Sequence, residues 1–481
     1  MGCSAITGGA AMQPNSSEQN GSSDEPRQPN TTTRNDGDAQ IKLVTAAAQG
    51  DLEVVKSLIN QGTIVDYIDH GLESALMKAA LHGHFEVVRY LLNAGANPDL
   101  KPLTGQTALM SAAANGHVDI VSLLLSVGAD FDKTDEVLGN TPLMLAADNG
   151  HVGVVRVLIA AGVNVNQVDK LQNSALILAA SKGHIRVVTA LIRHGVNLDY
   201  VDNTQETAAL EESAANGYLA IVDMLVSGGA NIDLQPDDGR TALMVASSNG
   251  HTEIVRYLIT AGADIEITDP GMRNALWLAS AEGHLEVVRC LIEVGGADVE
   301  SPDWLGISAL MEASSRGRLA IVDYLIQAGA DIHKVLRGGL NALMKASSKG
   351  HSEVVKLLVE KGANINSSGY FIGTALIMAA KNGHADVVNF LLANGANVDD
   401  AVHSTGETSL LAAVVGGHIQ VVDLLLKAGA NVSVQEALRR AASLGHLQIV
   451  RLLIDYGAKP DCETILKSVI EPRRQFLRIL G

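Results

Sequence analysis

The sequence predicts an all-α fold in which short helix pairs stack side by side into an elongated solenoid. Glycines recur at a nearly constant spacing along most of the 481 residues. Between them lie two short segments with apolar residues three and four apart, which is typical of amphipathic helices. One such pair cannot bury its own apolar face, so neighbouring pairs must cover it. Small and aliphatic side chains must fill this core, because 47% of the residues are hydrophobic but only 3% are aromatic.

Residues 140–167, which read NTPLMLAADNGHVGVVRVLIAAGVNVNQ, show the pattern of one unit. Thr141 predicts the start of the first helix, because its hydroxyl can accept an N–H of the first turn. Pro142 suits the first helical position, where no N–H is needed. Gly150 predicts the end of this helix, since the residue after a helix often needs a positive φ. Gly162 ends the second helix in the same way.

The glycine between the two helices occurs thirteen times, at spacings of 33 or 34 residues until the last, which follows after 28. These residues are Gly50, Gly83, Gly116, Gly150, Gly183, Gly217, Gly250, Gly283, Gly317, Gly350, Gly383, Gly417 and Gly445. We therefore expect a repeat array over residues 40–461. Residues 1–39 are rich in Ser, Asn, Gly and Pro and predict a disordered tail. Residues 462–481 predict a short basic capping helix or tail, with partner or membrane binding as the alternative.

The motifs of this array resemble those of the ankyrin-repeat family. They are the helix openings TALM (107–110 and 241–244) and TPLM (141–144), the turns NGH and KGH, the helices VVRYLL and VVKLLV, and loops of the GANVD type. The resemblance covers about residues 40–461. It implies stacked antiparallel helix pairs joined by β-hairpin-like finger loops. It also implies a non-catalytic scaffold or adaptor that recognises partner proteins through its fingers and inner helices.

One position departs from the family pattern TPLH, because the histidine is replaced by an apolar residue in most units. We call these residues the ladder: Met77, Met110, Met144, Ile177, Met244, Trp277, Met311, Met344, Ile377 and Leu411. Core packing is the favoured interpretation. A methionine-lined, adaptable binding face is the alternative.

A second departure is the unit TAALEESAANG, which has one extra residue between Thr207 and Gly217. An insertion in so short a helix predicts a π-bulge or a bend. It also brings Glu211 and Glu212 together near the concave side. With Asp148, Asp237 and Asp238, these residues predict an acidic middle of the array.

The histidines do not predict a metal site. Ten of the 15 follow the inter-helix glycine, so they stand one per unit, about 10 Å apart. Ligands of one metal ion lie about 2 Å from it. We expect these residues to form hydrogen bonds at the turn and the helix start. The sequence contains no phosphate-binding loop, nucleophile elbow or zinc-protease motif, so we predict no cofactor and no enzymatic activity.

Charge and cysteine content limit the class of partner and the compartment. The net charge of −18 argues against nucleic-acid binding, which needs clustered cations. The three cysteines form no disulfide or metal pattern, which fits a cytoplasmic protein. The sequence contains no run of 18 apolar residues and no secretory signal. We expect a monomer.

The N-terminal sequence Met-Gly-Cys-Ser makes Gly2 and Cys3 candidates for acylation, which would give a peripheral membrane attachment. The usual myristoylation pattern has Ser or Thr at position six, where this chain has Ile6. An unmodified tail is the alternative.

Large apolar residues on three neighbouring fingers predict a partner-binding site in the units spanning residues 277–383. Such residues are the usual anchors of interfaces. The candidates on the fingers are Trp304, Leu305, Arg337, Tyr370, Phe371 and Ile372, and those on the inner helices are Arg316, Lys345, Lys349 and Lys381. A partner with an acidic segment interrupted by apolar residues would suit this surface. Packing of the rings onto the next finger is the alternative, and a regulatory or targeting subunit of an enzyme is the alternative function.

Overall fold

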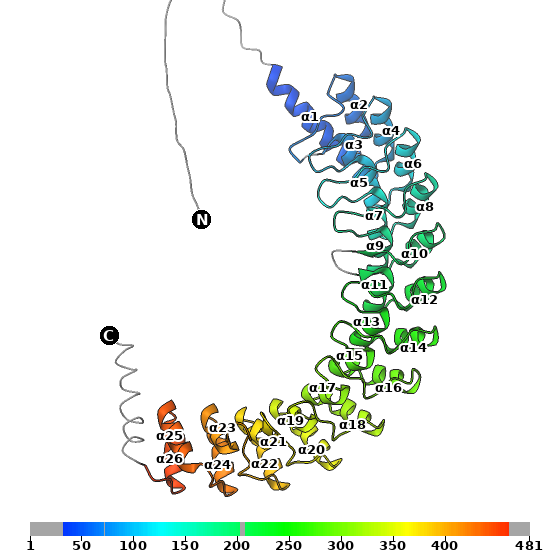
Figure 1. Ribbon diagram of the computed structural model, residues 1–481. Helices are drawn as coiled ribbons and strands as arrows, with labels where there is room; N and C mark the ends of the chain where they lie inside the picture. Colours follow the sequence, from blue (N-terminus) through cyan, green and yellow to red (C-terminus); the bar gives the residue numbers. More distant parts are fainter. Residues whose placement is uncertain (1–31, 72, 203–206, 461–481) are drawn as a thin grey trace, which may run out of the picture.

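The computed structural model describes residues 32–71, 73–202 and 207–460. In this part of the chain, helices pair along the sequence and stack into a curved array of two layers (Figure 1). One layer lies on the concave side together with the finger loops, and the other forms the convex side. Each inner helix contacts the inner helices before and after it and its own outer helix, so every contact is local to neighbouring units.

The inner layer contains the odd-numbered helices. They are α1 (Thr32–Gln49), α3 (Ala75–Leu81), α5 (Ala108–Ala114), α7 (Pro142–Asp148), α9 (Ala175–Ser181), α11 (Ala209–Ala215), α13 (Ala242–Asn249), α15 (Ala275–Glu282), α17 (Ala309–Ser315), α19 (Ala342–Lys349), α21 (Ala375–Lys381), α23 (Ser409–Gly416) and α25 (Val434–Leu444).

The outer layer contains the even-numbered helices. They are α2 (Leu52–Asn60), α4 (Phe85–Asn93), α6 (Val118–Ser126), α8 (Val152–Ala160), α10 (Ile185–Ile192), α12 (Leu219–Ser227), α14 (Thr252–Thr260), α16 (Leu285–Glu293), α18 (Leu319–Gln327), α20 (Ser352–Glu360), α22 (Ala385–Ala393), α24 (Ile419–Lys427) and α26 (Leu447–Asp455).

The fingers are short antiparallel hairpins. Strand β1 (Val201–Asp202) pairs with β2 (Thr207–Ala208), and β3 (Ser368–Gly369) pairs with β4 (Gly373–Thr374). Single β-bridges close four other fingers in the described residues, such as that between Pro302 and Ser308. Each finger leads directly into an inner helix, so the fingertips project beside the concave face.

The start of most inner helices is fixed by a cap, as the sequence predicts. At α7, the Thr141 hydroxyl accepts the N–H of Met144 at 3.2 Å. The Met144 sulfur accepts the N–H of Thr141 in return at 3.5 Å. Asn274 caps α15 with its side-chain oxygen, which accepts the N–H of Trp277 at 2.9 Å. These bonds satisfy N–H groups that have no partner inside the helix.

The thirteen inter-helix glycines all have positive φ, between 71° and 99°, as the sequence predicts. They also pack against the next unit. A Cβ on Gly250 would lie 2.5 Å from Nδ1 of His284, so a larger residue has no room there. The same ring donates from Nε2 to the Ser248 carbonyl at 2.9 Å. Glycine and histidine therefore form one junction between consecutive units.

Nine histidines make this bond to the end of the preceding inner helix, and Arg318 replaces one of them with a bond to the Ala281 carbonyl at 3.2 Å. The prediction that these residues form hydrogen bonds at the turn is confirmed. The prediction that they bond at the helix start is wrong, because the histidines that precede outer helices make no side-chain cap bond. Their partner is the preceding unit.

The ladder is buried, which confirms the core-packing interpretation. Its members are at most 7% exposed, and Met110 and Met244 are fully buried. Valine and leucine of the outer helices, such as Val255 and Leu258, cover it from the other layer. Since Trp277 is also in the ladder, its indole N–H needs a partner and donates to the Ile307 carbonyl at 3.1 Å.

The predicted π-bulge near Thr207 is wrong. Helix α11 has seven residues, as α5, α7 and α9 have, and the extra residue lies in the finger. Thr207 pairs with Asp202 in the β-hairpin, and Ala208 takes the cap position. Glu211 therefore stands where other units place the ladder residue.

Helix α1 begins at Thr32, within the stretch 1–39 for which the composition predicts disorder. Ala39 packs against the core and extends the helix face that Leu43 and Ala47 bury. The structure does not describe Gly2, Cys3 or residues 462–481. Acylation of the first two and a capping helix or tail in the last segment therefore stay predictions.

Candidate protein-binding surface

The predicted fingertip anchors are exposed to solvent. Trp304 is 67% exposed, Tyr370 59% and Phe371 69%. Leu305 is also exposed, whereas Ile372 is half-buried and packs against the core. The large rings therefore lie outside the core, and both the binding site and its alternative, packing onto the next finger, stay predictions.

Three consecutive fingers surround a cleft of about 700 Å³. Trp304 and Leu305 line it from one finger, and Arg337 lines it from the next. Met272 completes it from the finger before. The Trp304 N–H donates to the Gly271 carbonyl at 3.0 Å, which ties these two fingers together through the backbone. The cleft is apolar along most of its wall and has the cation of Arg337 at its edge.

The next finger forms an aromatic cluster. The rings of Tyr370 and Phe371 meet edge to face with centroids 4.8 Å apart. His403 of the following finger stacks on Tyr370 at 6.2 Å, and the Ser404 N–H donates to the Tyr370 carbonyl at 3.2 Å. The exposed rings are therefore held by neighbouring groups, which lowers the entropy lost on binding.

A second pocket of about 280 Å³ lies between this finger and the inner helix α21. Phe371 and Ile372 line it from the finger, and Met378 and Lys381 line it from the helix. The carboxylate-bearing Glu407 also lines it. The structure thus brings two predicted finger residues, Phe371 and Ile372, and one predicted cation of the inner helices, Lys381, into a single hollow.

The predicted cations of the inner helices fall into two groups. Arg316 pairs with Glu312 at 2.7 Å and with Glu282 at 3.0 Å, and Lys345 pairs with Glu312 at 3.3 Å. The hydrogen bond that Arg316 donates to Glu312 raises the pKa of Arg316 above its ordinary value. These two cations are neutralised by neighbours. Lys349 and Lys381 are exposed.

The predicted acidic middle of the array has less charge than its sequence suggests. Glu211 is only 5% exposed, and one of its oxygens accepts the Ala208 N–H at 2.9 Å. Burial, with smaller contributions from the carboxylates of Asp238 and Glu212, raises its pKa to about 9. Glu211 is therefore protonated at neutral pH and presents no charge on the concave side. Asp237 and Asp238 are exposed and keep their place on the finger.

The family model described as ankyrin repeats (three copies) matches ten overlapping stretches of the chain. These are residues 27–102, 43–135, 95–169, 127–202, 143–236, 201–269, 258–336, 310–402, 343–436 and 376–464. The chain belongs to the ankyrin-repeat family. Among solved structures, the human ASB11 ankyrin repeat domain is similar at 27% sequence identity, with a TM-score of 0.42. That match covers 46% of this chain and 98% of the solved one. No curated protein matches the chain.

Sequence reasoning missed two residues of the finger surface in this ankyrin array. Met272 is 51% exposed and adopts a positive φ of 56°, and it lines the 700 Å³ cleft. Val335 is exposed and lines the same cleft. Met272 is an apolar residue between polar neighbours such as Asp269 and Arg273, which is a signal that could have identified it, whereas Val335 lies beside Leu336.

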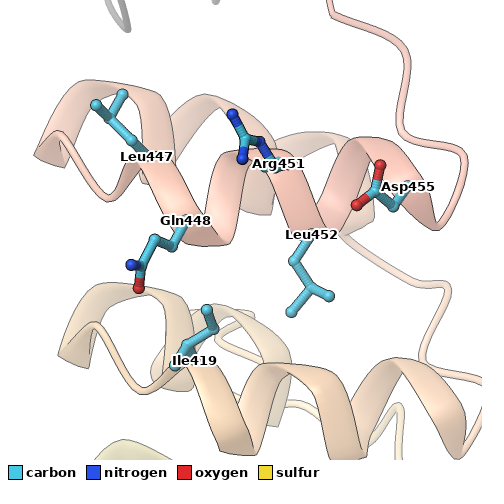
Figure 2. A pocket seen from close by; sticks show the side chains of 6 residues that line it. All are labelled: Ile419, Leu447, Gln448, Arg451, Leu452 and Asp455. Carbon is cyan, nitrogen blue, oxygen red and sulfur yellow. The ribbon is translucent and has the colours of Figure 1, made fainter.

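A third hollow of about 350 Å³ lies on the convex side of the ankyrin array, between α24 and α26. Figure 2 shows Ile419 of α24 pointing toward Leu452 and Gln448 of α26. Arg451 and Asp455 border it. This hollow lies on the outer helices, away from the fingers.

In the described part of the ankyrin array, no group of three or more His, Cys, Asp or Glu residues is placed to hold a metal ion. No described helix has the length and apolar character needed to cross a membrane.

Proposed function

We propose that this ankyrin array is a non-catalytic scaffold or adaptor that binds partner proteins through the fingertips and inner helices of residues 277–383. Ankyrin repeats are in general protein-interaction modules. The observation that carries the proposal is the placement of exposed Trp304, Tyr370 and Phe371 beside two hollows on neighbouring fingers. Large aromatic anchors next to pockets are typical of interface hot spots.

The mechanism is recognition by a surface that is ordered before the partner arrives. Backbone bonds between fingers hold Trp304 and Tyr370, so binding orders few groups of the array. A few anchors can then provide most of the affinity. We place this activity in the cytoplasm, with peripheral membrane attachment if Gly2 and Cys3 are acylated. Mass measurement of the intact N-terminus tests that attachment.

The test is a pull-down with the triple variant W304A/Y370A/F371A. We expect loss of most partner recovery, while helical content measured by circular dichroism stays unchanged. The matched control is L103A/V137A, which removes two exposed apolar residues from fingers of earlier units. Unchanged recovery with the triple variant, or equal loss with the control, would reject the surface. Recovery of one enzyme in a fixed ratio would favour a regulatory or targeting subunit over a scaffold.

A further inference from the structure

The fingers and inner helices of residues 277–383 carry cations that form no ion pair within the described part of the array. Arg337 lies at the edge of the 700 Å³ cleft, Lys381 lines the 280 Å³ pocket, and Lys349 lies at the end of α19. All three are exposed. Among the described residues, their side chains make no hydrogen bond or ion pair. Their positive charge is therefore available to a partner.

Most acidic groups near this surface are already engaged. Glu282 and Glu312 pair with Arg316 and Lys345. Glu300 pairs with Lys334 at 2.8 Å.

Asp303 accepts the N–H groups of Leu305 and Ile307 at 2.9 and 2.8 Å. Glu407 is the one carboxylate among the residues that line the smaller pocket. Arg337, Lys349 and Lys381 thus remain without an ion pair to a described carboxylate, although the chain as a whole carries a net charge of −18.

The two hollows can accept apolar side chains. Even the smaller one, at about 280 Å³, exceeds the cavity of about 150 Å³ that holds benzene in an engineered protein core. Met272, Trp304 and Leu305 line the larger one, and Phe371, Ile372 and Met378 line the smaller. Apolar walls beside unpaired cations favour a ligand that is both apolar and anionic.

We propose that this surface binds an extended, acidic segment of a partner protein that carries aromatic or large aliphatic anchors. This inference rests on the proposed function and names the chemistry of its partner. The anchors enter the two hollows, and Asp or Glu side chains between them pair with Arg337, Lys349 and Lys381. Stacked helices lie roughly 10 Å apart, and an extended chain advances about 3.3 Å per residue. Contacts to successive units therefore recur about every third residue of the segment.

The experiment is selection of random 12-residue peptides, displayed on phage, on the immobilised full-length chain. The most enriched peptide is then labelled, and its Kd is measured by fluorescence polarisation. We expect enriched peptides to combine Asp or Glu with Trp, Phe or Leu about three residues apart. The charge-reversal variant R337E/K349E/K381E should bind the labelled peptide at least ten-fold more weakly.

The matched control is R156E/R186E/R256E, which makes the same change in net charge on exposed residues of the outer helices. It should leave the Kd within about two-fold, and circular dichroism should match among the three proteins. Three outcomes would overturn the proposal. They are enriched peptides without acidic residues, equal weakening of binding by the control variant, and enrichment on the unmodified chain no greater than on the W304A/Y370A/F371A variant. Self-association of the unmodified chain that the charge reversal abolishes would overturn it as well, since a second acidic copy would then be the occupant.

These outcomes separate this inference from the proposed function. If the aromatic triple variant loses its partners in the pull-down but the charge-reversal variant keeps them, the surface binds protein without an acidic segment. If both variants keep their partners, the partners do not bind through this surface, and the proposed function is rejected as well.

Discussion

The units that contain Glu211 and Met244 differ at the ladder position and at the cap of the inner helix, because Thr241 caps α13 with its side chain and Ala208 makes no side-chain cap bond to α11. Met244 follows its cap Thr241 by three residues, and Glu211 follows Ala208 by three. Met244 is fully buried, and Glu211 is 5% exposed. The methionine fills the core, whereas the glutamate places a carboxyl group there. The glutamate's Oε1 has no hydrogen-bond partner among the described residues.

This comparison shows how the array tolerates a polar residue in its core. Glu211 accepts the N–H of its own cap residue, which partly replaces the missing Thr or Ser side chain at Ala208. Because the units contact only their neighbours, the cost of burying this group stays local. We therefore expect α11 to be the least stable inner helix of the middle units at neutral pH.

Moving the carboxyl group to the neighbouring unit should give the largest effect. We expect Met244→Glu to lower the free energy of unfolding by about 4 kcal/mol at pH 7, because it removes a buried apolar side chain and buries an acid. Urea unfolding followed by the fluorescence of Trp277, in the next unit's ladder position, measures this. Met244→Leu is the control and should cost less than about 1.5 kcal/mol. If Met244→Glu lowers the free energy of unfolding no more than Met244→Leu does, the side chain at this position is not buried in the core.

The opposite change, Glu211→Met, should remove the difference between the two units. Folding raises the Glu211 pKa from its ordinary value of 4.5 to about 9. Between these values the folded chain holds a proton that the unfolded chain has lost. The contribution of Glu211 to the free energy of unfolding is therefore complete below pH 4.5 and falls as the pH rises toward 9. At pH 7 it is about 3 kcal/mol smaller than below pH 4.5.

We accordingly expect Glu211→Met to stabilise the array by about 3 kcal/mol at pH 7 and to flatten its pH dependence across this window. Urea unfolding at pH 5, 7 and 9 measures both effects. Glu211→Gln separates them, because it removes the titration and keeps a polar side chain. A stability that does not change with pH in the unmodified chain would contradict the buried, protonated state of Glu211.

The glycine–histidine junction gives a third, smaller effect. Gly250→Ala should cost about 2 kcal/mol or more, because alanine resists φ = 79° and its Cβ meets the His284 ring. Gly262 also has positive φ, at 97°, but no atom lies within 4 Å of its Cβ position. Gly262→Ala should therefore cost only the backbone term of about 1–2 kcal/mol. His284→Ala should recover part of the loss in Gly250→Ala, and equal costs at both glycines would exclude the contact.

The smallest effect is expected at the fingertips. W304A, Y370A and F371A should each change the free energy of unfolding by less than about 0.5 kcal/mol, because these side chains are mostly exposed. The contrast with the ladder separates binding residues from core residues. Losses above about 2 kcal/mol in urea unfolding would assign the rings to packing instead.

The sequence was sufficient to predict most of the fold. The glycine spacing located the helix pairs because each glycine needs a backbone conformation that other residues resist, and the Thr and Ser caps located the helix starts. The burial of Met110 and Met144 was also predictable, since they share one position in units of one period. What failed was the π-bulge, because counting from Thr207 assumed that threonine always caps. Counting back from the inter-helix glycine would have avoided the error. Glu211 precedes Gly217 by six residues, as Met244 precedes Gly250, so the sequence alone assigns Glu211 to the ladder position.

The candidate site was less predictable. The exposed fingertip aromatics were identified because they are large residues in loops that are otherwise polar. Which cations stay unpaired depends on side chains from adjacent units, as in the bond between Arg316 and Glu282. Such a pair joins residues 34 positions apart, and its formation follows from the stacking geometry rather than from local sequence.

The junction between units also bears on how such a chain grows. Each inner helix presents a bare glycine and a carbonyl, and most following units supply an imidazole that meets both. A copied segment of 33 or 34 residues, inserted in phase, would find a fitting surface on either side. Gene duplication can thus lengthen this molecule without designing a new contact, while the loops remain free to diverge toward other ligands.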